Sequence, residues 1–416
     1  MEHRRLGAVV AGALLATIAC TGSTGGAGGS AGIAKVGAIL SLSGIFSTLG
    51  PPEQKAMTMG VDALNKQGFT VNGQKFTLQV TYADDKSDAA TTGTTQFRQM
   101  TQSDHLPLIA YGLGSSSYGQ LLKRASIPMI NILDSTYPSI LAYDPHLFLL
   151  RSDSPLYVPG CLYYAKTKLG LASISVISPT GEPYGEGLTA LVQKSAPTVG
   201  LTLKKTVQYP LGTTDFSNAI TQVLSDKPDA VYLSSVTAVQ LPVLKQLRQA
   251  GFTGPVFHSS GVNPNQAQAI LGADYNTIMK DNYDCAGTLP TTSAIPATKA
   301  FAAAYQARWN EYPQDLTMWA YDFPFVVASA MTKANSTSDA DKIFHALSEV
   351  SVPDGTVSGW LPASGNKLFS NRIAKTDSEI TMWCPDQKTI ASAMVYSVQD
   401  GSVISPNIRN NPCASV

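Results

Sequence analysis

Short apolar runs alternate with amphipathic segments along most of the chain, beginning at Ile33. Apolar runs bounded by turn residues predict buried strands, and apolar residues at helical spacing predict the helices that cover them. The predicted strands lie at residues 34–40, 75–84, 106–112, 127–132, 173–179, 203–210, 229–235 and 254–261. The predicted helices lie at residues 51–68, 84–100, 116–126, 154–170, 185–196, 216–226 and 238–251. Strands separated by such helices indicate βαβ units, so we expect an α/β fold of mostly parallel sheets covered on both faces.

The alternation breaks near Arg151 and then restarts, which predicts two similar lobes. No fixed-period repeat relates the two halves, so this prediction depends on the pattern alone. The rest of the chain is predicted to be helical at residues 295–312, 318–335 and 339–350, and rich in strands at 355–369 and 390–403.

The N-terminus has the pattern of an export signal. A basic start, "MEHRR", precedes an apolar run that is short for a membrane span. Residues 17–20, Thr-Ile-Ala-Cys, are similar to a bacterial lipobox, with threonine in place of the usual leucine. In such signals the cysteine, here Cys20, is lipidated and becomes the mature N-terminus. We therefore expect a signal peptide at 1–20 and a flexible Gly/Ser tether at 21–32. The alternative is a soluble secreted protein that loses Cys20 with its signal.

The charge balance does not favour nucleic acid as a partner. Lysine plus arginine and aspartate plus glutamate both number 29, so the formal net charge is zero. No basic patch stands out, and no later apolar run is long enough to cross a bilayer. Contact with a membrane is therefore expected through a lipid anchor only.

The cysteines are consistent with export. After Cys20 the chain has Cys161, Cys285, Cys384 and Cys413, which allow three pairings. We favour Cys384 with Cys413, which would fasten the C-terminal tail, and four buried free thiols are the alternative. The histidines are scattered without ligand spacing, so we expect neither a metal site nor a cofactor.

The segment 110–119, "AYGLGSSSYG", is the strongest candidate for a site. It lacks the string of a P-loop, and Ser117 occupies the third glycine position of a dinucleotide-binding fingerprint. A nucleophile elbow needs glycine two residues before and two residues after the serine. Ser116 has Tyr118 in the second of these positions, and Ser117 has Ser115 in the first. Nucleotide binding and serine hydrolysis are therefore disfavoured.

A hydroxyl-rich anion site is the remaining interpretation of this segment. Serines that open a helix after a parallel strand offer hydroxyl and backbone N–H groups, which suit a carboxylate at the end of the sheet. Ser115 and Ser116 are the candidate ligands, and simple capping of the helix by one of them is the alternative. Ser135 and Thr136 follow the next predicted strand and would face the same crevice, unless they form only a turn.

From about Lys35 to Val403, the chain resembles the leucine/isoleucine/valine-binding family. The resemblance depends on many short sequence segments that occur in the same order as in that family. They include "VGAILSLSGIFSTLG", "VNGQKFTLQVTYADDKSDAATT", "PYGEGL", "GTTDFSNAITQV", "PDAVYLSS", "LRQAGF" and "WAYDFPFVVASAM". These are type I periplasmic solute-binding proteins of ABC importers. The resemblance implies two lobes joined by a multi-strand hinge, with lobe 1 at 33–151 plus 287–375 and lobe 2 at 152–286 plus 376–416.

The resemblance also implies roles for particular residues. Ser115 matches the family's serine that binds the ligand carboxylate. Ser135 and Thr136 match a turn that holds the α-amino-acid end of the ligand. Tyr184, in the "YGEG" turn, matches an aromatic residue that closes over the ligand from the second lobe. Phe46 and Leu49 of the first loop would shape the apolar side of the pocket.

Two departures from the family limit the prediction of the solute. Ser260 stands where amino-acid binders place a carboxylate for the ligand ammonium, and Val236 and Thr237 replace an expected aromatic residue. A buried ammonium without that acid would be poorly compensated, although Asp134 could supply the charge from the other lobe.

The sequence therefore predicts an exported, lipid-anchored, monomeric receptor with no catalysis of its own. It would capture a small carboxylate-containing solute, an amino acid or a related organic or aromatic acid, by hinge closure, and present it to the membrane subunits of an ABC permease. A secreted ligand sensor of the same fold and a serine hydrolase are the alternatives.

Overall fold

The computed structural model describes residues 31–134, 140–152, 154–259, 264–287, 289–387, 389–398, 403 and 412–415. The chain groups into a short N-terminal unit, Met1–Ser30, and one compact unit, Ala31–Val416. The expected signal peptide, Cys20 and almost all of the expected tether therefore lie outside the described residues. All that follows concerns the unit that begins at Ala31.

The first sheet has the strand order β12-β13-β6-β5-β4-β1-β3-β2. Its strands are β1 (Gly32–Leu40), β2 (Phe69–Val71), β3 (Gln74–Asp84), β4 (Ile109–Tyr111), β5 (Met129–Asn131), β6 (Leu147–Leu149), β12 (Phe369–Ser370) and β13 (Ile373–Ala374). Strands β3, β1, β4, β5, β6 and β13 pair in parallel, whereas β2 and β12 are antiparallel edge strands. Side chains of β1 alternate between two apolar clusters, with Ala38 and Leu40 in one and Ile39 in the other. Both faces of this sheet are thus covered, as a parallel sheet requires.

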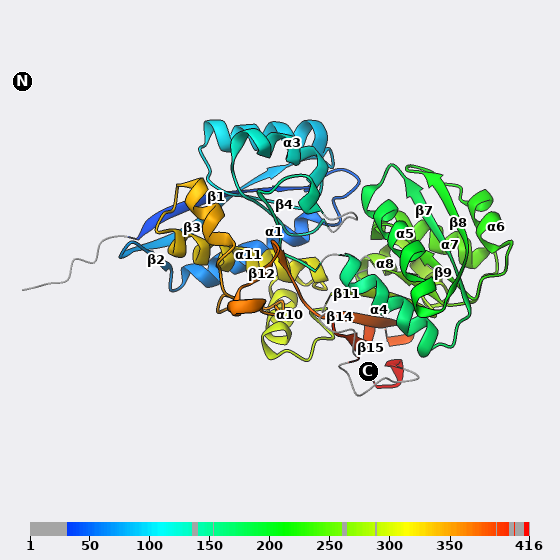
Figure 1. Ribbon diagram of the computed structural model, residues 1–416. Helices are drawn as coiled ribbons and strands as arrows, with labels where there is room; N and C mark the ends of the chain where they lie inside the picture. The colour runs from blue at the N-terminus through cyan, green and yellow to red at the C-terminus, as the bar shows by residue number, and fades with distance from the viewer. Residues whose placement is uncertain are drawn as a thin grey trace, which may run out of the picture. The chain divides into compact units, whose positions relative to one another are not determined.

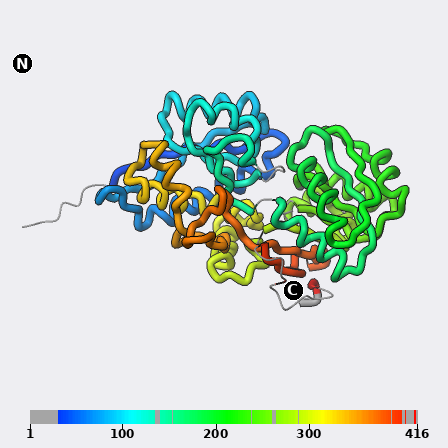
Figure 2. The backbone as a smooth tube through the Cα atoms, viewed as in Figure 1, coloured from blue at the N-terminus to red at the C-terminus, as the bar shows by residue number. Residues whose placement is uncertain are grey.

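The second sheet has the strand order β15-β14-β11-β10-β9-β7-β8. Its strands are β7 (Ser173–Thr180), β8 (Thr202–Pro210), β9 (Ala230–Leu233), β10 (Val256–His258), β11 (Asn282–Gly287), β14 (Ser378–Cys384) and β15 (Thr389–Tyr396). The strands from β8 to β11 are parallel, and β14 and β15 add antiparallel strands at one edge. In Figure 2 the orange and red C-terminal segment accordingly runs beside the end of β11.

Helices cover both sheets (Figure 1). Those associated with the first sheet are α1 (Gly50–Asn65), α2 (Thr94–Arg98), α3 (Ser115–Ala125), α10 (Pro296–Trp309), α11 (Asp315–Ala334) and α12 (Ala340–Leu347). Those associated with the second are α4 (Ser154–Thr167), α5 (Pro183–Ser195), α6 (Ser217–Leu224), α7 (Thr237–Gln249), α8 (Pro264–Leu271) and α9 (Tyr275–Ile278). The prediction of an α/β fold with two lobes of mostly parallel sheet is confirmed.

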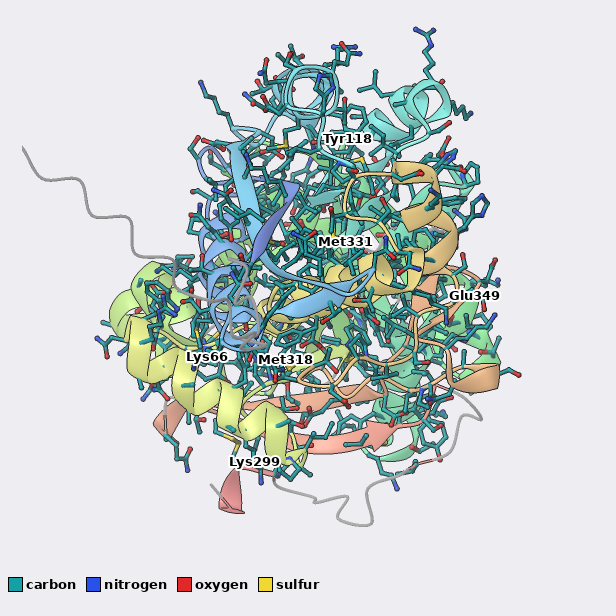
Figure 3. All side chains as sticks on the ribbon, turned by 90° about the vertical axis from the view of Figure 1, so that its left-hand side faces the viewer. Lys66, Tyr118, Lys299, Met318, Met331 and Glu349 are labelled. Atoms are coloured by element: carbon teal, nitrogen blue, oxygen red, sulfur yellow. A yellow bond between two sulfur atoms is a disulfide. The ribbon has the colours of Figure 1, made fainter. Side chains whose placement is uncertain are left out.

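Helix α11 is the central helix of the first lobe. Most of its residues are buried, including Met318 and Met331, which lie in the interior in Figure 3. Helix α1 packs closely against it because Gly60 lacks a side chain. A Cβ atom at Gly60 would lie 2.2 Å from the carbonyl oxygen of Tyr321.

Among the described residues, the chain passes between the two sheets three times: after β6, after β11 and after β13. The segments meet at Ser152 and Thr376, since the backbone N–H of Thr376 donates to Ser152 Oγ at 2.6 Å. Ser152 Oγ in turn donates to the carbonyl oxygen of Thr376 at 3.0 Å. A Cβ atom on Gly287, at the end of β11, would lie 3.0 Å from Thr376 Oγ1. The three connections therefore run side by side.

The helix predicted within 84–100 is present: Asp88 caps a helical segment that consists of α2 flanked by two π-helical turns, Ala89–Gly93 and Gln99–Ser103. One sequence prediction of secondary structure was wrong. The segment predicted to be strand-rich at 355–369 contains mainly turns and isolated bridges. Its glycines at 355, 359 and 365 have φ values of 86°, 70° and 73°, which extended strands do not accommodate.

Candidate ligand-binding site

The serine loop lies between β4 and α3, as the sequence predicts. Gly114 has φ 95°, and a Cβ atom there would lie 2.2 Å from Ala89 Cβ, so the turn requires glycine. Helix α3 begins directly afterwards at Ser115. Ser115 is buried, whereas Ser116 is exposed. The loop thus presents one inward hydroxyl and one outward hydroxyl.

The inward hydroxyl binds a carboxylate of the chain itself. Asp134, in the loop after β5, accepts hydrogen bonds at Oδ2 from Ser115 Oγ at 2.7 Å and from the Ser115 backbone N–H at 3.3 Å. Ser115 Oγ also lies 2.9 Å from the hydroxyl of Tyr111. An internal carboxylate therefore occupies the N-terminus of α3, the position that the sequence analysis assigned to a carboxylate of the ligand.

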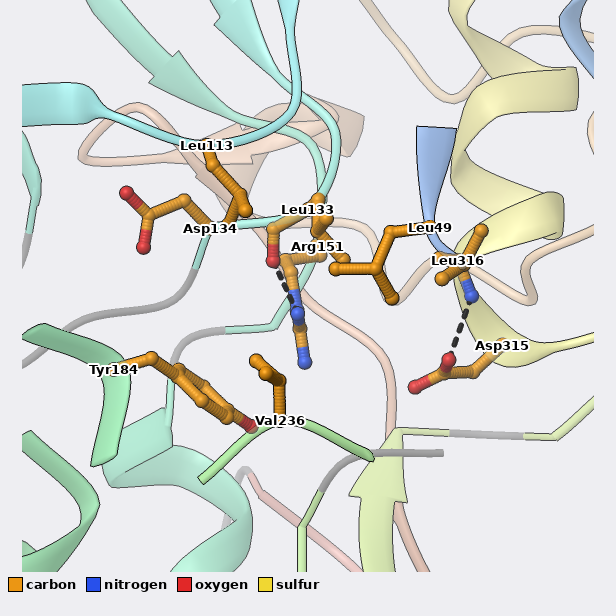
Figure 4. Close-up of a pocket in the computed structure, with 9 residues that line it drawn as sticks. All are labelled: Leu49, Leu113, Leu133, Asp134, Arg151, Tyr184, Val236, Asp315 and Leu316. Atoms are coloured by element: carbon orange, nitrogen blue, oxygen red, sulfur yellow. Dashed lines mark hydrogen bonds between the residues drawn. The ribbon is translucent and has the colours of Figure 1, made fainter. Parts of the chain in front are cut away.

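Two adjoining cavities open at this point, with empty volumes of about 400 Å³ and about 1030 Å³. Leu113, Asp134 and Tyr184 line both of them. The smaller cavity is also lined by Leu49, Leu133, Arg151, Val236, Asp315 and Leu316 (Figure 4). Because residues of both lobes line each cavity, the two cavities form one crevice between the lobes.

Tyr184 contributes the second lobe's aromatic side chain to this crevice. It follows Pro183 at the start of α5. Its hydroxyl donates to the carbonyl oxygen of Ser259 and lies 3.2 Å from the hydroxyl of Tyr157. These bonds hold the ring over the same cavities as Asp134.

Glu182 caps α5 beside Tyr184. Its Oε1 accepts from the backbone N–H of Tyr184 at 3.1 Å, and its Oε2 accepts from the N–H of Gly185 at 2.9 Å and from Ser235 Oγ at 3.1 Å. Burial raises the pKa of Glu182 to about 7, although these hydrogen bonds oppose the shift. Glu182 therefore titrates near neutral pH.

Arg151 supplies a cation to the smaller cavity. In Figure 4 its guanidinium extends from the Leu133 region toward Tyr184 and Val236. It donates to the carbonyl oxygen of Leu133 and, at 3.2 Å, to the hydroxyl of Tyr157, and it lies 4.4 Å from the centre of the Trp319 ring. Arg151 is 5% exposed, and its Nε finds no acceptor among the described residues. One donor of this buried cation is thus unsatisfied within the described residues.

Asp315, the first residue of α11, also lines the smaller cavity. It is 4% exposed, and its Oδ1 accepts from the backbone N–H of Leu316 at 2.7 Å. Burial raises the pKa of Asp315, and the charge of Arg151 opposes that shift.

Five residues predicted from the sequence line the crevice: Ser115, Ser116, Tyr184, Phe46 and Leu49. Phe46 packs against apolar clusters of both lobes. Ser135, Thr136 and Ser260, also predicted as ligand-binding residues, lie outside the described residues.

Sequence reasoning did not identify Arg151, Glu182 or Asp315 as site residues. A signal existed for Glu182, because an acid directly before a proline at a helix start is typical of an N-cap. A signal also existed for Arg151, because it directly follows the apolar run "LFLL". A cation that follows a buried strand in this way is a candidate for a buried or functional side chain.

The cysteines form two disulfides, Cys384 with Cys413 and Cys161 with Cys285. The described residues contain no group of three or more His, Cys, Asp or Glu side chains that could hold a metal ion. Within the same residues, no helix has the length and apolar character needed to cross a membrane.

Comparison with known proteins gives consistent matches over nearly the whole chain. Residues 34–402 match a sequence family described as "Periplasmic binding protein". The Leu/Ile/Val-binding protein homolog 8 of Brucella abortus (strain 2308) is 24% identical over 377 residues, which cover 86% of this chain and 89% of the relative.

Solved structures with a similar fold have different ligands. The leucine-binding protein LivK of Thermotoga maritima has a TM-score of 0.75 at 19% identity, covering 90% of this chain and 99% of that one. The branched-chain amino acid binding protein LivJ of Streptococcus pneumoniae, in complex with isoleucine, has a TM-score of 0.73 at 19% identity, covering 90% and 100%. A solute-binding protein from R. palustris, in complex with benzoate, has a TM-score of 0.73 at 15% identity, covering 91% and 99%.

Proposed function

Because the chain belongs to the periplasmic binding protein family, of the leucine/isoleucine/valine-binding type, we propose that it is the extracytoplasmic receptor of an ABC importer. The observation that supports this most directly is the crevice lined by both lobes, with Asp134 from the first and Tyr184 from the second. A solute held there would contact both lobes at once, and only such contacts favour the closed arrangement over the open one.

The proposal includes lobe limits of 33–151 plus 287–375 and of 152–286 plus 376–416. The three chain connections near Ser152, Gly287 and Thr376 support these limits, because they lie where the limits place the hinge.

The proposed solute is a small organic molecule of the size of an amino acid or an aromatic acid. The structural relatives with isoleucine and with benzoate support this range, since both ligands are small and carry a carboxylate. Arg151 is the cation that a solute carboxylate would meet in the smaller cavity.

We further propose that the receptor acts as a monomer, that Cys20 carries a lipid anchor and that a permease recognises the closed form. The lipobox-like residues 17–20 support the anchor, and the family supports the permease. Catalysis is not part of the proposal. A serine hydrolase of the Ser–His type would need a histidine beside its serine, and no histidine is among the described residues that line either cavity.

The test is a thermal-shift screen of the mature chain against amino acids, organic amines, and aromatic and aliphatic acids. We expect at least one solute to raise the Tm and to lower the radius of gyration in small-angle X-ray scattering, because binding favours closure. The Tyr184→Ala variant should bind that solute about 10- to 100-fold more weakly, since it loses the second lobe's aromatic contact. If no solute of any class stabilises the protein, the proposed function is wrong.

A further inference from the structure

The crevice brings together two helix N-termini, and an acidic side chain of the chain already accepts backbone N–H groups at each of them. Asp134 binds the N-terminus of α3 from the first lobe, and Glu182 binds the N-terminus of α5 from the second. A helix N-terminus attracts an anion through its free N–H groups and its dipole. A ligand anion at either helix start would therefore compete with an acidic side chain that is already bound there.

The larger cavity has further acidic side chains in its lining. Its described lining contains four carboxylates, those of Asp85, Asp88, Asp134 and Glu182, and no lysine, arginine or histidine. A carboxylate that entered this space would face repulsion and would have to displace Asp134 from Ser115. A cationic group would meet complementary charge instead.

The smaller cavity, in contrast, has a cationic side chain in its lining. Arg151 lines it, is almost fully buried, and has an Nε donor without an acceptor among the described residues. An unsatisfied donor of a buried guanidinium is costly unless a ligand or water accepts its hydrogen bond. The acceptor end of a solute therefore belongs at Arg151, and its cationic end belongs at Asp134, which lines both cavities.

We propose that the crevice selects a solute with a cationic nitrogen, an ammonium or amidinium group, which binds the carboxylate of Asp134 and faces Glu182. This orientation is the reverse of the sequence prediction, which placed a ligand carboxylate at Ser115. Where the solute has a carboxylate, that group pairs with Arg151. The inference rests on the proposed function, because it assumes that the crevice is the solute site.

The first test compares probes that differ only in the nitrogen, by titration calorimetry on the mature chain. Leucine, 4-methylpentanoate and isoamylamine form one series, and phenylalanine, 3-phenylpropanoate and phenethylamine form another. We expect the better binder in each series to carry the ammonium, with an affinity at least 10-fold above that of its acid partner without nitrogen.

The second test reverses the selectivity with variants of Asp134. Asp134→Asn should weaken binding of the ammonium probe about 100-fold, because it removes the charge that the cation meets. Asp134→Ala should release Ser115 and the N-terminus of α3, so that 4-methylpentanoate or 3-phenylpropanoate gains affinity. Asp339→Asn is the matched control, because Asp339 also caps a helix, α12, but lines neither cavity. The Tm of each variant without ligand shows whether it folds, and the comparison of probes on the wild type needs no variant.

The outcomes separate the two proposals. If the acids without nitrogen bind the wild type better than the ammonium probes, or if the solute found by screening lacks a cationic nitrogen, this inference is overturned while the proposed function stands. If no solute of any class binds, the proposed function fails and the inference fails with it.

Discussion

Single carboxylates determine the chemistry of the crevice at the residue scale. Asp134 and Glu182 come from different lobes, and both are at least nine-tenths buried and both accept backbone N–H groups at a helix start. Burial alone would disfavour their charged forms, and the N–H groups partly compensate it. Asp134 lines both cavities and Arg151 lines the smaller one, so an acidic and a cationic side chain face the same space.

The raised pKa of Glu182 leads to a prediction about stability. The folded protein holds this proton up to a pKa of about 7, whereas the ordinary pKa of an exposed glutamate is 4.5. Between these values the unfolded chain is ionised and the folded chain is not, so stability falls as pH rises through this window. Glu182→Gln should remove this part of the pH dependence, which amounts to about 3 kcal/mol across the window.

The measurement is urea unfolding of wild type and variant at pH 4.5, 6 and 8. Asp322, whose pKa burial also raises to about 7, remains in both proteins, so the difference between them isolates Glu182. The groups that face Glu182 electrostatically are Asp134 and Tyr209. Parallel stability curves for the two proteins over this range would contradict the prediction.

The sequence predicted some of the residues that line the crevice because they belong to local motifs. Ser115 follows a strand and opens a helix, and Tyr184 follows a proline at a helix start, so each is evident from its own segment. The hydrogen bond between Ser115 and Asp134 joins two loops from different βα units. It therefore forms only because of the way these loops pack together. For that reason the sequence did not predict that Asp134 accepts hydrogen bonds from Ser115.

Close helix packing sets the geometry of the first lobe at the element scale. Helix α1 begins next to Leu49, which lines the crevice, and it packs through Gly60 against α11, which carries Asp315 into the same crevice. The spacing of these two helices therefore also fixes the distance between two walls of the smaller cavity.

Gly60→Ala should destabilise the protein by about 1–3 kcal/mol, because the added methyl group would overlap the carbonyl of Tyr321 and push α1 from α11. Urea unfolding provides the measurement. Asp62→Ala, on the exposed face of the same helix, is the control and should change the stability by no more than about 0.5 kcal/mol, since its ion pair with Arg308 is exposed. A Gly60→Ala protein as stable as the control would show that the contact is not tight.

At this scale the alternation of apolar and amphipathic segments was sufficient to predict most strands and helices. It was insufficient at 355–369, where Val357 and Trp360 are buried without forming a strand. The carboxylate of Asp322 on α11 accepts the backbone N–H groups of Val357 and Ser358 and the indole N–H of Trp360. A side chain distant in sequence thus takes the place of a neighbouring strand, and no local pattern reveals this.

The whole molecule is organised around the three connections that run between its sheets. Ser152 and Thr376 join two of them by hydrogen bonds, and Gly287 lies against Thr376. The lobes also touch between α8 and the segment before α1, where the side chain of Gln266 donates to the carbonyl oxygen of Thr48 at 3.2 Å. A bundle of short connections with a lined crevice beside it is the arrangement that hinge closure over a solute requires.

The crystal structure of the mature chain with the solute found by screening tests the central claim most directly. We expect the solute to lie between the two lobes, in contact with Tyr184, with its cationic nitrogen about 3 Å from the carboxylate of Asp134. A solute carboxylate bound to Ser115, with Asp134 turned away, or a solute bound outside the crevice would contradict it.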